Sequence, residues 1–207
     1  MKNKTQEEID KYYTRRASSS DFMNYGEINK AREYLIKNLK ILEGEKVLEI
    51  GIGSGRNLPY FTEKTTLFGL EKNEAMLRTL KYNSGKNTLE KLFLVRGDGK
   101  NICFGREFDV VVMAYVLSAI PKSELVLKEA RRILKPKGRM GILDFGKTPK
   151  NLPESNGFVN FNLKKLIKKQ TGFKEKQVLT FTDIVDLLGK RYSLPPPQEI
   201  YLLEKKS

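Results

Sequence analysis

Three alternating glycines follow an apolar stretch of the chain and could hold a ligand close to the backbone. They are Gly51, Gly53 and Gly55, within Val47–Asn57. Glycines let a ligand approach the backbone because no Cβ atom stands in the way. Their spacing is G-x-G-x-G, whereas a dinucleotide-binding fingerprint has its third glycine at the position that Arg56 holds here. The sequence therefore predicts a ligand-binding turn for a dinucleotide or for a nucleoside without phosphates.

Carboxylates follow the apolar stretches at three places, Glu49, Glu71 and Asp98. A carboxylate at Glu49 would repel a pyrophosphate and favour a cationic sulfonium or ammonium group. Glu71 could accept hydrogen bonds from both ribose hydroxyls, and Asp98, beside the Gly99 backbone, could accept one from an adenine amino group. Taken singly, Glu71 also suits a helix N-terminus and Asp98 a turn. Together, at successive strand ends, they predict a nucleoside site on the carboxyl edge of a doubly wound sheet.

The chain has no histidine and a single cysteine, Cys103. It therefore lacks the usual general base and the commonest metal ligand. A zinc enzyme and a catalytic triad are strongly disfavoured on these grounds, and we expect no metal site. The chemistry must need little proton transfer, or must use tyrosine, a carboxylate or the substrate itself.

The elements that must position these residues alternate between strand and helix patterns. Short apolar runs predict strands at 46–50, 66–70, 91–95, 108–114 and 139–145, and around 173–180 and 199–203. Apolar residues at helical spacing predict helices at 27–44, at 73–83 with Asn73 as N-cap, at 123–134 capped by Ser123, and within 160–172. This order predicts an α/β fold with a doubly wound, mostly parallel seven-stranded sheet of Rossmann-like type and helices on both faces.

The length predicts one domain over residues 27–207, preceded by an arm. Residues 1–26 are polar and interrupted by serine and glycine, yet they carry four aromatic residues, so we expect a flexible arm that docks as a lid. The alternative is an arm that only packs on the outer face of helices. Within the domain, we expect the ligand-binding core at about 44–146 and substrate-side elements at about 148–197.

The net charge is +14, and most of the excess comes from residues 121–207. This basic half could contact an anionic partner such as RNA or a lipid surface, or its lysines could simply solvate helix faces. The chain has no apolar run long enough to span a membrane and no apolar signal-peptide region, so we expect a cytoplasmic protein without a transmembrane segment. The oligomeric state stays open.

As an ordered set, these stretches resemble the motifs of the class I S-adenosylmethionine-dependent methyltransferases. Residues 47–57 resemble the first motif, 69–77 the second and 95–104 the third, and 108–145 are similar to the fourth strand, its helix and the fifth strand. IGSGRNLPYF and VLSAIP are most similar to a small-molecule branch that includes phosphatidylethanolamine and quinone methyltransferases. The chain departs from that branch at KPKG, where KPGG is usual, and at Phe145, where a histidine is frequent.

The resemblance implies an enzyme that transfers a methyl group in line from S-adenosylmethionine to a small-molecule or lipid-like acceptor and releases S-adenosylhomocysteine. Glu49 and the glycines would hold the methionine end, Glu71 the ribose and Asp98 the adenine. The full implied cofactor site is Glu49, Gly51, Gly53, Gly55, Asn57, Glu71, Lys72, Met76, Asp98, Gly99, Ala114 and Tyr115. The candidates for the acceptor side are Tyr12, Tyr13, Tyr25 and Tyr115, of which Tyr12, Tyr13 and Tyr115 are the catalytic candidates.

Three other functions stay open. The basic half favours an RNA or protein methyltransferase, although AYVLSAIP stands where base-directed amino methyltransferases often have Asn/Asp-Pro-Pro-Tyr/Phe. A non-catalytic module that binds the cofactor is the second. An NAD oxidoreductase is the third, and the glycine spacing disfavours it.

Overall fold

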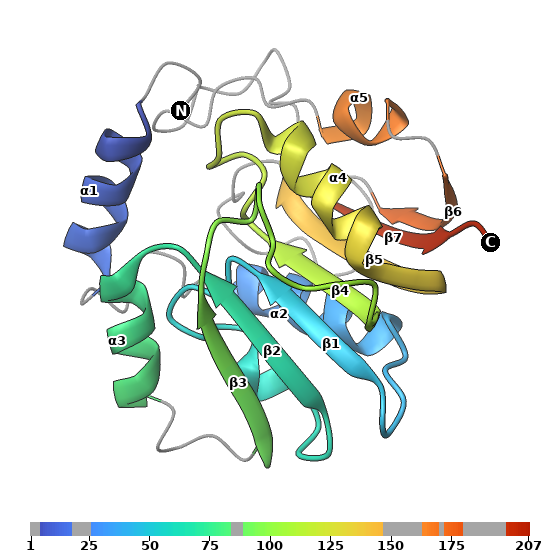
Figure 1. Ribbon diagram of the computed structural model, residues 1–207, viewed down its shortest axis with the longest axis horizontal. Coiled ribbons are helices and arrows are strands. Elements are labelled where there is room, and N and C mark those ends of the chain that lie inside the picture. Colours follow the sequence, from blue (N-terminus) through green and yellow to red (C-terminus); the bar gives the residue numbers. More distant parts are fainter. Residues whose placement is uncertain (1–4, 18–25, 84–88, 147–162, 170–171, 180–197) are drawn as a thin grey trace.

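The computed structural model describes residues 5–17, 26–83, 89–146, 163–169, 172–179 and 198–207. In these residues a single seven-stranded sheet has the strand order β3-β2-β1-β4-β5-β7-β6 (Figure 1). The strands from β1 to β5 pair in parallel, and β7 is antiparallel to both of its neighbours, β5 and β6. The strands are β1 (Lys46–Ile50), β2 (Thr66–Glu71), β3 (Lys91–Arg96), β4 (Phe108–Ala114), β5 (Leu134–Phe145), β6 (Phe173–Leu179) and β7 (Gln198–Lys205). The predicted doubly wound, mostly parallel sheet is confirmed.

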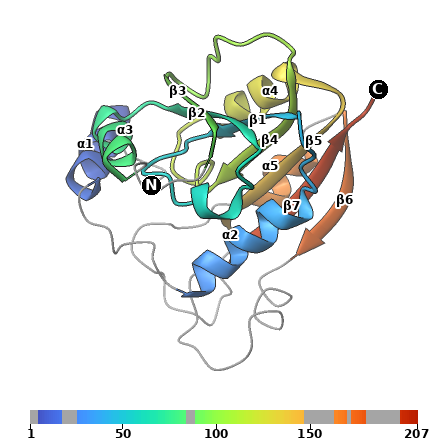
Figure 2. The ribbon, with the colours of Figure 1, turned by 90° about the horizontal axis from the view of Figure 1, so that it is seen from below.

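Helices cover both faces of this sheet. One face packs against α2, η1 and α3, and the other against α4 and α5. Figure 2 shows α2 and α4 on opposite sides of the strands. The central strand β4 is buried on both faces, as is typical of parallel sheets between helix layers. The helices are α1 (Gln6–Arg16), α2 (Gly26–Asn38), η1 (Leu58–Tyr60), α3 (Glu74–Asn83), α4 (Ser123–Ile133) and α5 (Leu163–Lys168).

Two helix boundaries differ from those predicted. The helix predicted to reach Gly44 ends at Asn38, because Lys40 has a positive φ of 48°. Ser123 does not cap α4: it is the first helical residue, and the cap position belongs to Lys122, in a left-handed conformation and without a side-chain cap bond. Asn73 does cap α3, since its Oδ1 accepts a hydrogen bond from the Met76 N–H at 3.1 Å.

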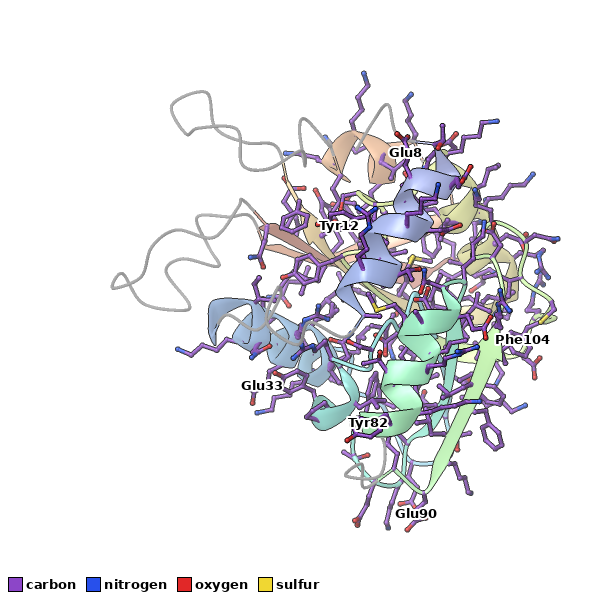
Figure 3. All side chains as sticks on the ribbon, turned by 90° about the vertical axis from the view of Figure 1, so that its left-hand side faces the viewer. Glu8, Tyr12, Glu33, Tyr82, Glu90 and Phe104 are labelled. Atoms are coloured by element: carbon purple, nitrogen blue, oxygen red, sulfur yellow. The ribbon has the colours of Figure 1, made fainter. Side chains whose placement is uncertain are left out.

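The N-terminal segment is more ordered than the expected flexible arm. Residues 6–16 form α1, which begins with a capping box in which Thr5 and Glu8 each bond the other's backbone N–H. Figure 3 shows α1 lying above α3, with Glu8 and Tyr12 on it. The Asn73 Nδ2 donates to the backbone oxygen of Asp10 at 3.1 Å, so the N-terminus of α3 holds α1 in place. The rest of the arm, including Tyr25, lies outside the described residues.

The described C-terminal elements close the sheet edge. On α5, Leu163 and Ile167 are buried, while Lys164, Lys165 and Lys168 are exposed, so the predicted amphipathic pattern is present. The segment 148–197, expected on the substrate side, lies largely outside the described residues. No helix in the described ranges is long and apolar enough to cross a membrane.

Candidate functional site

A cavity of about 200 Å³ opens at the carboxyl ends of the central strands. It is lined by the turn after β1, the end of β2, the loop after β3 and the segment after β4. Residues of α1, α2 and β5 also line it, namely Ile9, Asp10, Tyr13, Arg32 and Phe145. Eleven of the predicted site residues line this one cavity. They are Tyr13, Glu49, Gly51, Gly53, Glu71, Lys72, Met76, Asp98, Gly99, Ala114 and Tyr115. Three others, Tyr12, Gly55 and Asn57, are not part of its lining.

The backbone conformation and the close packing of the turn after β1 require glycine at two positions. Gly51 has a φ of +71°, and a Cβ there would lie 2.6 Å from Cγ2 of Val116. Gly55 has a φ of +84°, and a Cβ there would lie 2.8 Å from Cδ1 of Leu58. A larger residue at either position would be strained and would collide with the core. Of the glycines in this turn, Gly51 and Gly53 line the cavity and present backbone without a side chain to it.

Glu71 is fixed in the cavity by backbone donors on both sides. One carboxylate oxygen accepts from the Gly53 N–H at 3.0 Å and the other from the Asn73 N–H at 2.7 Å. Burial raises the pKa of Glu71, and these backbone hydrogen bonds oppose the rise. Each oxygen can accept more than one hydrogen bond, so the carboxylate can still take two hydroxyl donors.

Asp98 forms a turn and an ion pair at the next strand end. Its Oδ1 accepts from the Lys100 N–H at 2.9 Å, and the Lys72 Nζ donates to Oδ2 at 3.0 Å. Burial alone would raise the pKa of Asp98, but these two lysines together hold it below the ordinary value. Asp98 is therefore an ionised acceptor at neutral pH, and both the turn and the ligand-binding interpretation stay compatible with its position.

A chain of buried polar side chains runs beneath the glycine turn. Asn57 Nδ2 donates to Glu49 Oε1 at 2.7 Å, and Arg32 Nη1 donates to Asn57 Oδ1 at 2.8 Å. Burial raises the pKa of Glu49 to about 8, although Arg32 and Asn57 oppose the rise. Burial also lowers the pKa of Arg32, although the nearby Tyr115 and Glu49 raise it in part. Among the described residues, Glu49 Oε2 and Arg32 Nε are buried atoms without a hydrogen-bond partner.

The three catalytic candidates differ in their surroundings. Tyr115 lines the cavity with its ring 5.1 Å from that of Phe145, but its hydroxyl is buried and donates to Gln198 Oε1 at 2.6 Å. Burial raises the pKa of Tyr115 above its ordinary value, which disfavours the phenolate that a general base would need. Tyr13 faces the cavity, and Tyr12 stands edge-on against Tyr13 at 5.3 Å.

The sequence interpretation missed Arg32, which lines the cavity, and Gln198, which bonds the cavity residue Tyr115. Arg32 lies on the same face of α2 as Ile28 and Leu35, and it is only 6% exposed. A charged residue within an apolar helical face was a signal of a buried polar contact, because such a charge is costly without partners. Gln198 had no such signal, since it reaches the site only through the pairing of β7 with β5.

Comparisons with known proteins agree with this fold. A family model described as "Methyltransferase domain" matches residues 48–142. A solved S-adenosylmethionine-dependent methyltransferase from Aquifex aeolicus superposes with a TM-score of 0.68 and 17% identity, covering 95% of this chain and 98% of that one. In its matched residues and its fold, the chain is thus similar to S-adenosylmethionine-dependent methyltransferases.

Curated relatives within this class are moderately similar. The demethylmenaquinone methyltransferase of Lactobacillus johnsonii is 30% identical over 155 residues, which are 70% of this chain and 64% of the relative. The phosphatidylethanolamine N-methyltransferase of Cereibacter sphaeroides is 29% identical over 103 residues, 49% of this chain and 51% of the relative. The chain thus spans about half to just under two thirds of these relatives.

Proposed function

We propose that this protein transfers the methyl group of S-adenosylmethionine to a small-molecule or lipid-like acceptor and releases S-adenosylhomocysteine. The main support for this proposal is that two residues lining the cavity each have a buried polar atom without a hydrogen-bond partner. These atoms are Glu49 Oε2 and Arg32 Nε. Burial disfavours the ionised carboxylate of Glu49, and a cationic ammonium group beside it would offset that cost. The guanidinium of Arg32 would donate hydrogen bonds to a carboxylate. An amino-acid end carries both groups, so these residues fit it.

The other cavity residues fit the remainder of the same molecule. Glu71 would accept hydrogen bonds from the ribose hydroxyls, and Asp98 would accept one from the adenine amino group. The turn at Gly51 and Gly53 would lie against the methionine part of the cofactor. A dinucleotide fits less well, because Glu49 is a buried acid next to the place where a pyrophosphate would lie. This agreement between three carboxylates and one ligand supports S-adenosylmethionine over NAD.

S-adenosylmethionine, when bound, supplies an electrophilic methyl group on a sulfonium, so the protein needs no covalent step. The residues of this chain would align the acceptor and exclude water. Apolar and aromatic side chains form the acceptor-facing wall, and aromatic faces can attract a cationic centre. These side chains are Ile9, Tyr13, Tyr115, Ala119, Ile120 and Phe145.

The character of that wall supports the acceptor class. These apolar and aromatic side chains would suit a ring or an acyl chain. Relatives named for demethylmenaquinone, sterols and phosphatidylethanolamine act on acceptors of that kind. The acceptor atom, nitrogen, oxygen or carbon, stays open, as does the use of a base.

We further infer that α1 acts as a lid. Asp10 and Tyr13 line the cavity from α1, and the Asn73 side chain donates to the Asp10 carbonyl and to the Thr14 hydroxyl. A helix that lies over a cavity at the edge of the sheet can open for exchange and close to exclude water. Tyr13 is then the arm residue closest to the reacting atoms.

Binding and turnover test this proposal in two steps. S-adenosylhomocysteine is expected to raise the melting temperature of the protein and NAD is not, because only a ligand of the folded state stabilises it. Methyl-labelled S-adenosylmethionine is then supplied with a quinol, a sterol, phosphatidylethanolamine and total RNA. Label in a lipid-like product supports the proposal. A larger shift with NAD, or no transfer to any small molecule or lipid, contradicts it.

An RNA methyltransferase is the second candidate, because of the net charge of +14 and the exposed lysines of α5. Label in RNA alone in the same assay would favour it. A cytoplasmic location stays a prediction, which cell fractionation would test.

A further inference from the structure

Gln198, the first residue of β7, is fully enclosed although it follows a segment outside the described residues. It is 2% exposed, and its Oε1 accepts the hydroxyl hydrogen of Tyr115 at 2.6 Å. A buried glutamine without a partner would be costly, so this bond satisfies both side chains. It joins the end of β4 to β7, on the other side of β5 in the sheet.

The position of Tyr115 is set by contacts at both of its ends. Its backbone has a φ of 61°, rare for a residue with a side chain, and its N–H donates to the Leu143 oxygen at 2.7 Å. At the other end, the hydroxyl is held by Gln198. The ring between these anchors therefore has little freedom to tilt.

Arg32 lies on this ring. The centre of its guanidinium is 4.8 Å from the ring centroid, and Nη1 donates to Asn57. A buried guanidinium over an aromatic face gains a cation–π interaction that strengthens when water is excluded. Asn57 and the Tyr115 ring together determine where the unpartnered Nε points.

We propose that Gln198 is a positioning residue for the amino-acid end of the cofactor, acting through the Tyr115 ring and Arg32. The inference rests on the proposed function, in which Arg32 meets the carboxylate of that end. Loss of the bond to Gln198 would remove the anchor at the hydroxyl end of Tyr115, and the ring would be free to tilt. Arg32 would follow the ring and lose its aim at the carboxylate.

Calorimetric titration with two ligands separates this role from a structural one. S-adenosylhomocysteine carries the amino-acid end, and 5′-methylthioadenosine lacks it but keeps the adenine and ribose. We expect Gln198→Leu and Tyr115→Phe each to weaken S-adenosylhomocysteine binding about fivefold, the size of one net hydrogen bond. The affinity for 5′-methylthioadenosine should stay within about twofold of that of the unchanged protein.

Tyr34→Phe is the matched control. The Tyr34 hydroxyl also bonds a glutamine of the sheet edge, Gln177 on β6, but Tyr34 is not among the cavity residues. It should change neither affinity. The double variant Gln198→Leu with Tyr115→Phe should bind S-adenosylhomocysteine about as well as either single variant, because both remove the same bond.

The possible outcomes are distinct. If both ligands weaken equally, or neither does, Gln198 has only a structural role and the inference is overturned. If Gln198→Leu does not fold, Tyr115→Phe alone decides between these results. If the unchanged protein binds no S-adenosylhomocysteine, the proposed function itself fails, which the first titration reveals before any variant is made.

Discussion

Glu49 links proton binding to ligand binding. Its pKa is raised to about 8, mainly by burial, from an ordinary value of 4.5. Between these two values the folded protein without ligand holds a proton that the unfolded chain has lost, so stability falls as pH rises through the window. A cationic ammonium beside Glu49 would favour the ionised carboxylate. Binding of S-adenosylhomocysteine at about pH 7 should therefore release a proton.

Glu49→Gln should remove both effects. The variant without ligand should lose less unfolding free energy between about pH 5 and pH 8.5 than the unchanged protein, by more than about 1 kcal/mol, since one pKa unit corresponds to about 1.4 kcal/mol. Urea titrations at both pH values measure this difference. Asp144, whose buried carboxyl has a pKa of about 6, contributes equally to both proteins and cancels in the comparison. An unchanged pH dependence in the variant would show that Glu49 does not titrate there.

Calorimetry in buffers of different ionisation enthalpy should detect the released proton in the unchanged protein and not in Glu49→Gln. The variant should also bind S-adenosylhomocysteine more weakly. Equal proton release in both proteins would assign it to another group.

Glu71 combines ligand binding with a structural role. From its position at a strand end alone, we would expect Glu71 to contribute little to stability. However, its two carboxylate oxygens accept hydrogen bonds from the Gly53 and Asn73 N–H groups. Glu71→Ala should therefore weaken S-adenosylhomocysteine binding by about 1.5–3 kcal/mol, and also cost roughly 1 kcal/mol of stability. Glu74→Gln is the control, because Glu74 is exposed and forms its ion pairs with Arg78 and Arg96 on the surface. Unchanged affinity of Glu71→Ala on titration would remove Glu71 from the site.

At the scale of elements, α1 is the part whose removal is most informative. Deleting residues 1–25 leaves the sheet and its other helices intact, so the protein should still fold. Binding of S-adenosylhomocysteine should weaken modestly, because the strand-end carboxylates remain, whereas methyl transfer should be lost once water enters the cavity. Circular dichroism, calorimetry and the label-transfer assay measure these three properties. Methyl transfer at the full rate in the truncated protein would contradict a lid role.

Most elements of the sheet could be predicted because their apolar runs reflect burial between two helix layers. The run in β4 is such a case. The helix α1 could not, because its composition is polar and few of its residues are buried, Ile9 among them. Its Thr5–Glu8 capping box was a local signal, but the bonds from Asn73 that hold α1 over the cavity are tertiary. Propensity does not report such contacts.

The candidate site also has residues that the sequence predicts and residues that only the tertiary structure brings together. Glu49, Glu71 and Asp98 could be found from the sequence, because parallel strands bring their carboxyl ends to one edge. Arg32 and Gln198 come from a helix before β1 and a strand beyond β5, and their convergence depends on strand order. The sequence also gave no sign that the Tyr115 hydroxyl is directed to Gln198 and engaged there.

At the scale of the whole molecule, the positive charge suggests that the protein binds an anionic membrane surface and takes its lipid-like acceptor from there. Lys164 and Lys168 are exposed on α5. Reversing both to glutamate should reduce binding to vesicles that contain phosphatidylglycerol, and about 0.5 M salt should reduce binding of the unchanged protein. Vesicle co-sedimentation measures both effects.

Lys30→Glu with Lys91→Glu is the matched control, since it changes the net charge equally on exposed residues of α2 and β3. An equal loss in both double variants would mean that total charge, and not the α5 surface, determines binding. Salt-insensitive binding would contradict an electrostatic contact.

The position of β7 has a consequence for the order in which the molecule is assembled. β7 follows β6 in the chain, yet it lies between β5 and β6 in the sheet. While the chain is being synthesised, β5 must therefore keep an unpaired edge until β7 has left the ribosome and inserted beside it. Only that insertion brings Gln198 to Tyr115. The proposed site for the amino-acid end of the cofactor would thus be completed only after β7 has been synthesised, and the ligand could stabilise the finished sheet but not guide its earlier strands together.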